Sequence, residues 1–442
     1  MAPEQTGSAQ TGSEQPGPAQ TGPGHDSPGT FEAAQKQAAA WLADNWDPSR
    51  TVRAWWALLA ESGWGFPQFP VEWFGQGLPA PAVAGVRAAF TEAGVLGPPA
   101  SLGQMLGAPM LLVHGSEEHK ARFLPVLVRG EEAWCQFFSE PGSGSDLASA
   151  QTRAVRDGDI WHVDGQKVWT SGAQWADRGM LLARTNRDVP KHQGLSFFII
   201  DVVQPGIEVR PLHQMNGAHG FNEVFFTDAR ADADAMISEE NGGWSVAVTV
   251  LMYERFMSAL PTVAPGPRSG NLDRPAGEAA TGALQQRRRG RTGVAQVVAD
   301  VARQLGESAD PVLRQKLATL YTKETALTCY GRAGQAAARS GRRPSAAGSL
   351  SKLGRSDLVR AGRDTGMAVL GAEGMLNSPD TPGGGEIQQR ALSAPGASIA
   401  GGTDEIQRGI VGERVLGLPK EPRTDRDVPF RDLTIGTQRP IT

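Results

Sequence analysis

The spacing of hydrophobic residues changes twice along the chain. Over residues 31–132 apolar residues recur at helical intervals, and AWWALLAESGW has a glycine after its last periodic position. Residues 133–242 instead hold short β-branched and aromatic runs separated by Gly, Asp, Asn and Pro, a pattern typical of antiparallel strands. Helical spacing then continues to residue 420. The pattern predicts an α+β protein with a helical domain, a central antiparallel barrel or sandwich, and a second helical domain.

Three segments depart from these patterns. Residues 1–30 contain six Gly and five Pro but no Ile, Leu, Val, Phe or Trp. They cannot offset the entropy of ordering, so we expect a disordered leader. Residues 264–292 are rich in Pro, Gly and Arg and are expected to be a flexible insertion between two helices. The arginines within 287–291 could bind a phosphate, although a solvated loop is the more ordinary interpretation. Residues 421–442 are expected to be a C-terminal tail.

Composition excludes several classes of protein. At 442 residues the chain is long enough for two or three domains, and 40% hydrophobic residues suffice for a core. Forty-seven acidic and 43 basic residues give a net charge of −4, which is not the basic balance of a nucleic-acid-binding protein. Two cysteines, Cys135 and Cys329, cannot form a disulfide framework, and neither a membrane-length apolar run nor a secretory signal occurs. We expect a cytoplasmic protein with no membrane span, and no metal site is predicted.

Glycine and serine follow a predicted strand in WCQFFSEPGSGSDLAS, residues 134–149. Glycines such as Gly144 let the backbone approach a flat or anionic ligand closely. Ser139, Ser143 and Ser145 add small hydrogen-bonding groups. A plain turn between two strands has the same composition, so both interpretations stay open here.

A second candidate segment is DGQKVWTSGAQWAD, residues 164–177. At a strand end, Trp169 offers an aromatic face beside the hydroxyls of Thr170 and Ser171. A tricyclic aromatic cofactor needs an apolar face and a few placed donors. A core tryptophan followed by an ordinary turn is the alternative.

The helix predicted over residues 244–260 is apolar nearly all round, which indicates burial. Its only strongly polar side chains are Glu254 and Arg255, which point about 100° apart and cannot pair along the helix. Burial disfavours a carboxylate, so the pKa of Glu254 should rise toward neutrality. Glu254 is therefore a candidate general base, and an ion pair with another element is the structural alternative.

The last candidate segment is ASIAGGTDEIQRGIVGERVLGLPKEP, residues 397–422. Two glycines precede Thr403 and Asp404, either of which can cap the helix that follows. The open amides of a helix N-terminus attract negative charge, so a ligand could bind here. A helix start that binds nothing is the alternative.

Taken together, residues from about 31 to 422 resemble the acyl-CoA dehydrogenase family. The motifs that carry the resemblance occur in the family's order: CQFFSEPGSGSD, GQKVWTSGA, FNEVFFTDAR, YERF and GGTDEIQRGIVGERVLGLP. The resemblance implies an N-terminal helical domain, a central β-barrel and a C-terminal four-helix bundle. It also implies that FAD binds between barrel and bundle and reaches a neighbouring subunit.

The resemblance assigns roles to particular positions. Three residues match positions that contact the substrate: Ser145, Met252 and Arg255. The residues that match FAD-contacting positions are Gln136, Phe138, Ser139, Gly144, Ser145, Trp169, Thr170, Ser171, Gly371, Ala372, Thr403 and Glu405. Of these, Gly371 and Ala372 lie in a turn that relatives place against the FAD of a partner subunit.

The position of the catalytic base distinguishes two groups of relatives. Many carry a glutamate directly before the Gly-Thr of the last motif, where this chain has Gly401. A second group, which includes isovaleryl- and long-chain-specific members, carries it on the buried helix directly before an arginine, and Glu254 with Arg255 match. The implied reaction is removal of the α-proton of an acyl thioester by Glu254 while the β-hydride passes to FAD, which gives the 2-enoyl thioester. The implied electron acceptor is an electron-transferring flavoprotein.

One family feature has no clean match. Relatives carry an Arg-x-x-Phe-Gly stretch whose arginine holds the FAD pyrophosphate across the dimer, and Arg303 or Arg314 are only candidate substitutes. A homodimer or homotetramer is expected, and a heteromer in which a second chain completes the FAD site stays open. A non-catalytic partner subunit and a flavin oxidase or monooxygenase are the alternative functions. The sequence does not determine the acyl group or whether CoA or a carrier protein bears it.

Overall fold

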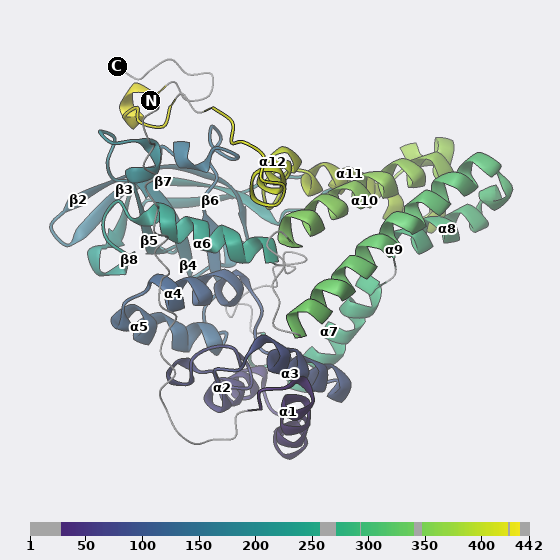
Figure 1. Ribbon diagram of the computed structural model, residues 1–442, viewed down its shortest axis with the longest axis horizontal. Helices are drawn as coiled ribbons and strands as arrows, with labels where there is room; N and C mark the ends of the chain where they lie inside the picture. Colours follow the sequence, from purple (N-terminus) through teal and green to yellow (C-terminus); the bar gives the residue numbers. More distant parts are fainter. Residues whose placement is uncertain (1–27, 257–270, 292, 340–346, 423–424, 434–442) are drawn as a thin grey trace, which may run out of the picture.

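The computed structural model describes residues 28–256, 271–291, 293–339, 347–422 and 425–433. Nearly all of the predicted leader, residues 1–30, therefore lies outside the described residues. Figure 1 shows a group of short helices, a sheet beside them, and long helices that project away from both. This order of helices, strands and helices confirms the predicted fold class.

Five α-helices form the N-terminal region. Thr30 and Thr51 cap the first two, since each hydroxyl accepts a hydrogen bond from the amide three residues later. A turn of π-helix, Gly103–Gly107 (η2), comes before the fourth helix, and its two glycines leave room for the Trp134 ring. The helices are α1 (Phe31–Asn45), α2 (Val52–Ser62), α3 (Ala80–Ala93), α4 (Ala108–His114) and α5 (Glu117–Val128).

An eight-stranded sheet follows. Its strands are β1 (Trp134–Phe137), β2 (Arg153–Asp157), β3 (Ile160–Ser171), β4 (Arg178–Arg184), β5 (Leu195–Asp201), β6 (Ile207–Pro211), β7 (Phe221–Asp232) and β8 (Met236–Ile237). The hydrogen-bonded order is β6-β7-β3-β2-β4-β5-β8, and β1 pairs with β4. The sequence predicted antiparallel pairing throughout, but β1 is parallel to β4, and β2 meets β4 in parallel at one residue pair. The reason is that the chain leaves β1 through a long turn and the β2–β3 hairpin before it forms β4, which is long enough for a parallel crossover.

The C-terminal helices follow the sheet, and α8, α9, α11 and α12 pack around α10. They are α6 (Gly243–Phe256), α7 (Ala276–Arg291), α8 (Val294–Gln304), α9 (Pro311–Arg339), α10 (Ala347–Leu370), α11 (Glu386–Ala397) and α12 (Asp404–Arg414). Helices α8, α9, α10 and α11 pack together as the projecting arm in Figure 1, and α12 lies against α10. The apolar contacts inside this arm include Val298, Val301, Leu320, Val369 and Ile387. The helices thus form the bundle that the family resemblance implies.

The structure corrects the prediction of a flexible insertion over residues 264–292. Residues 276–291 form α7, and the segment before it binds to the N-terminal helices: the amide of Arg53 donates to the Leu272 carbonyl at 2.9 Å. Leu272, Ala276 and Ala279 are buried in the apolar cluster of α1, α2 and α3. Small apolar residues at helical spacing therefore outweigh the Pro and Gly around them. Residues 257–270 and the side chains of the arginines within 287–291 lie outside the described part of the chain.

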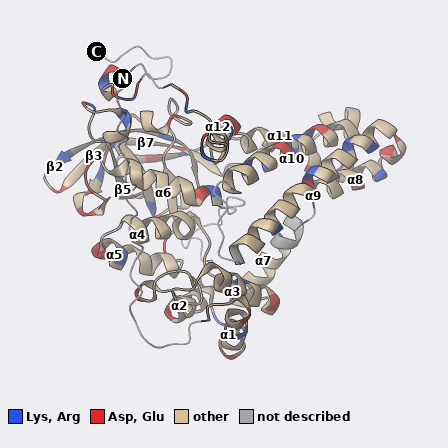
Figure 2. Cartoon of the chain, in the orientation of Figure 1, with Lys and Arg blue, Asp and Glu red and all other residues tan. Residues whose placement is uncertain are grey.

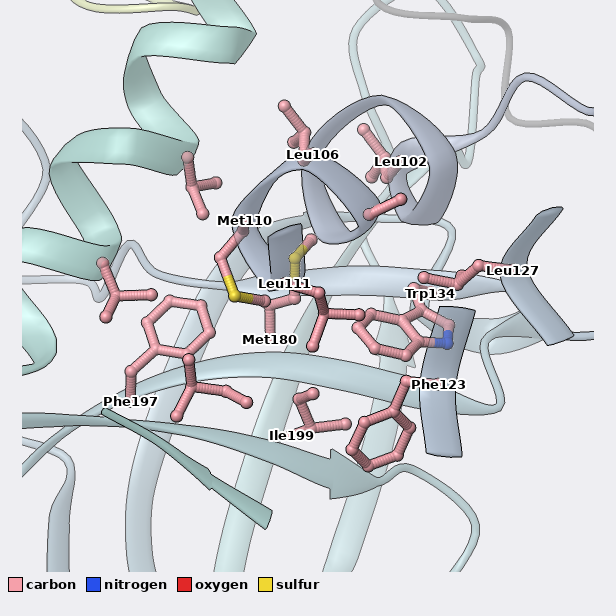
Figure 3. Packing of buried hydrophobic residues seen from close by; sticks show 14 of the residues in the cluster. Leu102, Leu106, Met110, Leu111, Phe123, Leu127, Trp134, Met180, Phe197 and Ile199 are labelled. Carbon is pink, nitrogen blue, oxygen red and sulfur yellow. The ribbon is translucent and has the colours of Figure 1, made fainter. Parts of the chain in front are cut away.

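The largest apolar core lies where the N-terminal helices, the sheet and α6 meet. Met110 and Leu111 of α4 point toward Met180, Phe197 and Ile199 of the sheet (Figure 3). Val246, Ala247 and Val250 of α6 belong to the same cluster. This packing fixes α6 relative to strand β1, which is what positions the candidate site.

Lys, Arg, Asp and Glu are spread over the helices, strands and loops, whereas α6 carries charge only near its C-terminal end (Figure 2). The charged residues at that end of α6 are Glu254 and Arg255. Among the helices that the structure describes, none is both long and apolar enough to cross a membrane.

Candidate active site

Two of the motif segments meet where strands β1 and β3 end. The carbonyl of Ser139, just beyond β1, accepts a hydrogen bond from the amide of Val168 at 2.9 Å. This contact places residues 136–139 beside Trp169, Thr170 and Ser171 at the end of β3. The structure therefore brings together the two segments that the sequence singled out separately.

Trp169 has an unusual backbone conformation and an exposed ring. Its φ is 61°, in the left-handed region that residues with a side chain rarely adopt, and the pairing of β3 with β7 shifts register between Lys167 and Thr170. The side chain is 60% exposed, and its ring meets Phe221 edge-on with 6.0 Å between centroids. Strained backbone concentrates at functional sites, and here the strain presents a flat aromatic face to the outside. A plain core tryptophan is therefore excluded.

Thr170 lies beside this ring with an unsatisfied hydroxyl. Thr170 is 1% exposed, and its Oγ1 has no hydrogen-bond partner in the described part of the chain. Buried polar atoms are nearly always paired, so an orphaned one indicates a ligand or water that the protein chain does not supply. The next residue, Ser171, is partly buried.

The Gly-Ser turn that follows β1 is closed by hydrogen bonds between Glu140 and Ser143, and the residues that come next are exposed. The amides and carbonyls of Glu140 and Ser143 bond each other at 2.8 and 3.0 Å, which closes the turn. Gly144 and Ser145 are exposed, and a Cβ added to Gly144 would meet no atom within 4 Å. Backbone amides here are free to approach a ligand. Phe138 differs from the prediction, because its side chain packs against Phe197 in the core and only its main chain could face a ligand.

A buried ion pair fixes the base of this turn, and sequence analysis missed it. Lys167 is fully buried, and its Nζ donates to the Glu140 carboxylate at 2.8 Å and the Phe138 carbonyl at 2.9 Å. Burial alone would raise the pKa of Glu140, but Lys167 and the amides of Gln151 and Thr152 lower it below its ordinary value. Burial lowers the pKa of Lys167, and Glu140 counteracts this. A lysine in an inward-facing register position of β3 was the available signal.

Glu254 faces the end of β1. The Nε2 of Gln136 donates to its Oε2 at 3.5 Å, and no described cation forms an ion pair with it. Burial is the largest influence and raises the pKa of the Glu254 carboxyl, against smaller lowering effects from Gln136 and Arg255. The structural alternative, a pair with a cation on another element, therefore finds no support among the described residues. The carboxyl group therefore holds a proton more readily than an exposed glutamate does, as a candidate base requires.

Helix α6 is buried along one face only, which corrects the prediction of burial all round. Val248 and Met252 are 41% and 42% exposed, and with Arg255 they lie along one side of the helix. Gly348 of α10 packs against Arg255, where an added Cβ would lie 3.2 Å from the Arg255 carbonyl oxygen. Burial, and then the charge of Arg414, lower the pKa of Arg255. The end of α6 therefore adjoins α10 and α12.

Helix α12 begins at the predicted cap. The hydroxyl of Thr403 accepts from the Ile406 amide at 3.3 Å, whereas Asp404 points elsewhere: its carboxylate bonds Lys352 at 2.7 Å and Arg360 at 2.5 Å. Glu405 is exposed and pairs with Arg408 at 3.4 Å. Because α12 has 11 residues and its last turn lies near Arg255, Thr403 is about 16 Å farther along the helix.

Two predicted cofactor residues lie far from the others. Gly371 and Ala372 belong to a 3₁₀ turn, Gly371–Met375 (η9), at the C-terminal end of α10. The N-terminal end of α10 touches Arg255, and a helix of 24 residues is about 35 Å long. One chain therefore does not bring Gly371 and Ala372 to Glu254.

Comparison with known proteins identifies the family to which the chain belongs. Models of the acyl-CoA dehydrogenase N-terminal, middle and C-terminal domains match residues 30–131, 135–229 and 277–416. The acyl-CoA dehydrogenase IpdE1 of Mycobacterium tuberculosis is 34% identical over 416 residues, which cover 89% of this chain and 99% of that protein. FadE34 of the same organism is 37% identical over 317 residues, 71% of this chain and 39% of FadE34.

Comparison with solved structures supports the same family. The Tcur3481-Tcur3483 steroid ACAD superposes with a TM-score of 0.63 at 26% identity and covers 88% of this chain and 98% of its own. The ChsE4-ChsE5 complex from Mycobacterium tuberculosis has a TM-score of 0.61 at 26% identity, with the same two coverages. The chain belongs to the acyl-CoA dehydrogenase family of flavoprotein oxidoreductases and is an enzyme of that class. The family resemblance read from the sequence motifs is thereby confirmed.

Proposed function

We propose that this protein introduces a 2,3-double bond into an acyl-CoA thioester, with Glu254 as the base and FAD as the oxidant. The observation that carries the proposal is the Glu254 carboxyl, whose pKa is raised by burial and which adjoins Gln136 at the end of β1. A base of raised pKa is matched to removal of a weakly acidic proton. The acyl-CoA dehydrogenase membership of the chain fits the same reaction.

The residues at the ends of β1 and β3 fit FAD. The exposed Trp169 face suits a flat ring, and the orphaned Thr170 hydroxyl needs a partner such as a ring nitrogen or oxygen. Gly144 and Ser145 allow a phosphate to approach main-chain amides. When bound, FAD would supply the acceptor for a hydride from the β-carbon.

The chain's own part in the reaction is proton removal and positioning. A Glu254 oxygen takes the α-proton, and the electrons of that C–H bond form the new carbon–carbon double bond. The apolar surroundings of α6 exclude water, which keeps the carboxylate basic. Arg255 lies one residue further along the helix and favours the ionised form of Glu254 through its charge.

The acyl group that we propose is bulky and apolar, as in a steroid side chain or ring fragment. Val248 and Met252 present an exposed apolar stripe on the helix that carries Glu254. A relative with a solved structure is named as a steroid ACAD, at 26% identity. Ser145 and Arg255 are the polar residues that we propose for the thioester and CoA portion.

A second chain is proposed to complete the cofactor site. Gly371 and Ala372 are about 35 Å from Arg255 along α10, so they can serve only the site of another subunit. One similar structure is named as the complex of ChsE4 and ChsE5. A homodimer, a homotetramer and a heteromer all satisfy this distance, and the catalytic residue Glu254 favours an active subunit over a non-catalytic partner.

We further propose an electron-transferring flavoprotein as the acceptor, because the exposed Trp169 ring would extend from the flavin to the surface. A cytoplasmic location is part of the same proposal and agrees with two unpaired cysteines, Cys135 and Cys329.

Anaerobic reduction of the bound flavin tests the function. Purified protein reconstituted with FAD is mixed with straight-chain, branched and steroid-derived acyl-CoA thioesters, and loss of flavin absorbance is followed while mass spectrometry identifies the product. We expect rapid bleaching with a steroid-derived thioester and a product that lacks two hydrogens. Absence of bleaching with every thioester contradicts the proposal. When oxygen is then admitted, rapid reoxidation of the flavin with a hydroxylated product or hydrogen peroxide supports an oxidase or monooxygenase instead.

A further inference from the structure

The last described segment of the chain, residues 425–433, is bound to the loop that joins β4 and β5. The amide of Phe430 donates to the Val189 carbonyl at 2.9 Å, and the amide of Arg431 donates to the Arg187 carbonyl at 3.0 Å. Arg431 also pairs with Asp188 at 2.8 Å. Phe430, in the 3₁₀ turn Phe430–Asp432 (η11), is 2% exposed. The predicted tail, residues 421–442, thus contains a segment that docks on the loop between β4 and β5.

Phe430 covers a buried arginine. The guanidinium carbon of Arg184 lies 3.7 Å from the centre of the Phe430 ring, and Arg184 is itself 2% exposed. Its guanidinium donates to the carbonyls of Ala148 at 2.5 Å, Ala150 at 3.2 Å and Lys191 at 2.6 Å. No described carboxylate forms an ion pair with Arg184, so backbone carbonyls, the aromatic face and the more distant charges of Glu140 and Asp146 stabilise the guanidinium. Burial lowers the pKa of Arg184 to about 9.

A second buried cation joins the same segment to the same turn. Lys191 Nζ lies 2.8 Å from Asp146 and 2.6 Å from Asp425. Asp146 in turn accepts from the Ser149 hydroxyl at 2.5 Å, and its carbonyl accepts from the Ser143 hydroxyl at 2.8 Å. Both cations thus connect residues 425–430 to residues 143–150, the turn that carries Ser145.

We propose that the C-terminal segment is a latch for the flavin-binding turn, with Phe430 as the positioning residue that acts through Arg184. The inference rests on the proposed FAD site at Gly144 and Ser145. Phe430 keeps water from the Arg184 guanidinium, so its hydrogen bonds to Ala148 and Ala150 persist and the turn stays ordered before the cofactor arrives. A turn that is already ordered loses less entropy when it binds a ligand.

Amide hydrogen exchange of the full-length protein tests the latch directly. For Phe430→Ala we expect the hydrogen-bonded amides of Ser143, Ser149 and Ala150 to exchange about tenfold faster, while α10 and α11 keep their protection. Titration of the apoprotein with FAD should give a dissociation constant raised about tenfold by the same change. Asp427→Ala is the matched control, because Asp427 is exposed in the same segment, and it should change neither quantity.

A milder variant covers the case in which Phe430→Ala does not fold. Asp425→Asn removes the charge opposite Lys191 without emptying the core, and we expect about threefold faster exchange of the same three amides. Unchanged protection of the turn in both variants overturns the latch, as does an equal rise over the whole sheet, which would indicate general destabilisation. Exchange is measured on protein without flavin, so it decides the latch even if the wild-type protein binds no FAD, which would overturn the proposed function separately.

Discussion

Glu254 is a single acidic residue on an otherwise apolar helix, and its chemistry follows from what surrounds it. Burial disfavours the carboxylate, and the contacts that favour it, a 3.5 Å hydrogen bond from Gln136 and the charge of Arg255, are too weak to cancel that effect. The sequence alone predicted this, because the apolar neighbours of Glu254 are visible in it. It could not identify Gln136 as the contact, since the two residues are 118 positions apart.

The raised pKa of Glu254 predicts a pH-dependent rate. Only the carboxylate can accept the α-proton, so flavin reduction should slow about tenfold per pH unit below the raised pKa. The effect on stability has the opposite sign: the contribution of this carboxyl is fully present below its unfolded pKa and is lost as the pH rises through the folded pKa. Stopped-flow rates of flavin reduction between acidic and neutral pH measure the effect on the rate. A flat profile across the range in which the protein stays folded contradicts the assignment.

The Lys167–Glu140 pair was hidden from sequence analysis because a lysine in a strand is ordinarily exposed. Here the fully buried Lys167 holds both the carboxylate and the Phe138 carbonyl. We expect Lys167→Met to lower the free energy of unfolding by about 3–5 kcal/mol, because it leaves Glu140 buried without its cation.

The double variant Lys167→Met with Glu140→Gln removes both charges and should recover part of that loss. Urea unfolding of the single and double variants measures both changes. Equal instability of the two variants would mean that packing, not the unpaired charge, is responsible.

Helix α12 is fixed at its N-terminal end by two adjacent residues. Thr403 caps its first turn after two glycines with positive φ, and Asp404 ties it to α10 through Lys352 and Arg360. The sequence left Thr403 and Asp404 as equal candidates for the cap. Only the position of α10, which no local pattern encodes, decides between them.

Replacing Asp404 tests this attachment. Burial alone would raise its pKa, but hydrogen bonds from Lys352, Arg360 and Ser356 hold the pKa of Asp404 well below the ordinary value. Asp404→Asn should therefore lower the free energy of unfolding by about 2 kcal/mol at neutral pH. The deficit should shrink only at strongly acidic pH, where Asp404 loses its charge in the unfolded and then the folded state. Thermal unfolding at a series of pH values measures this loss of stability. Glu405→Gln, on the exposed side of the same turn, is the control.

Helical and strand regions were predictable because their apolar periodicity is strong, whereas two features that depend on distant contacts were not. The Gly and Arg content of residues 276–291 predicts a loop, whereas the Ala residues among them form helix α7 and pack on α1, α2 and α3. The strand pattern predicts antiparallel pairing for β1, but β1 pairs with β4 in parallel, because strand direction depends on the path of the chain between strands. The latch at Phe430 also has no local sequence signal, because Phe430 contacts Arg184 and Val189, which are distant in the sequence.

At the scale of the whole molecule, α10 separates two groups of candidate residues. Glu254 and its contact Gln136 lie near the N-terminal end of α10, whereas Gly371 and Ala372 follow its C-terminal end. Figure 1 shows α10 running out along the projecting arm. If two identical chains share two sites, each site takes its base from one chain and its turn from the other.

Mixing two inactive variants tests this sharing. Glu254→Gln removes the base, and Ala372→Asp places a negative charge on an exposed turn that would face the FAD pyrophosphate. A mixed dimer holds one intact site, so refolding an equal mixture of the two variants should restore about one quarter of wild-type activity. No recovery, with dimers present by analytical ultracentrifugation, contradicts a homodimeric site and supports a heteromer.

The most direct measurement of the central claim is anaerobic flavin reduction in Glu254→Gln. The glutamine keeps the size of the side chain but cannot accept a proton, so we predict that reduction slows about a thousandfold while FAD stays bound. Glu240→Gln, an exposed glutamate just before α6, should reduce at the wild-type rate. Wild-type bleaching by Glu254→Gln would contradict the account, since another group would then be removing the α-proton.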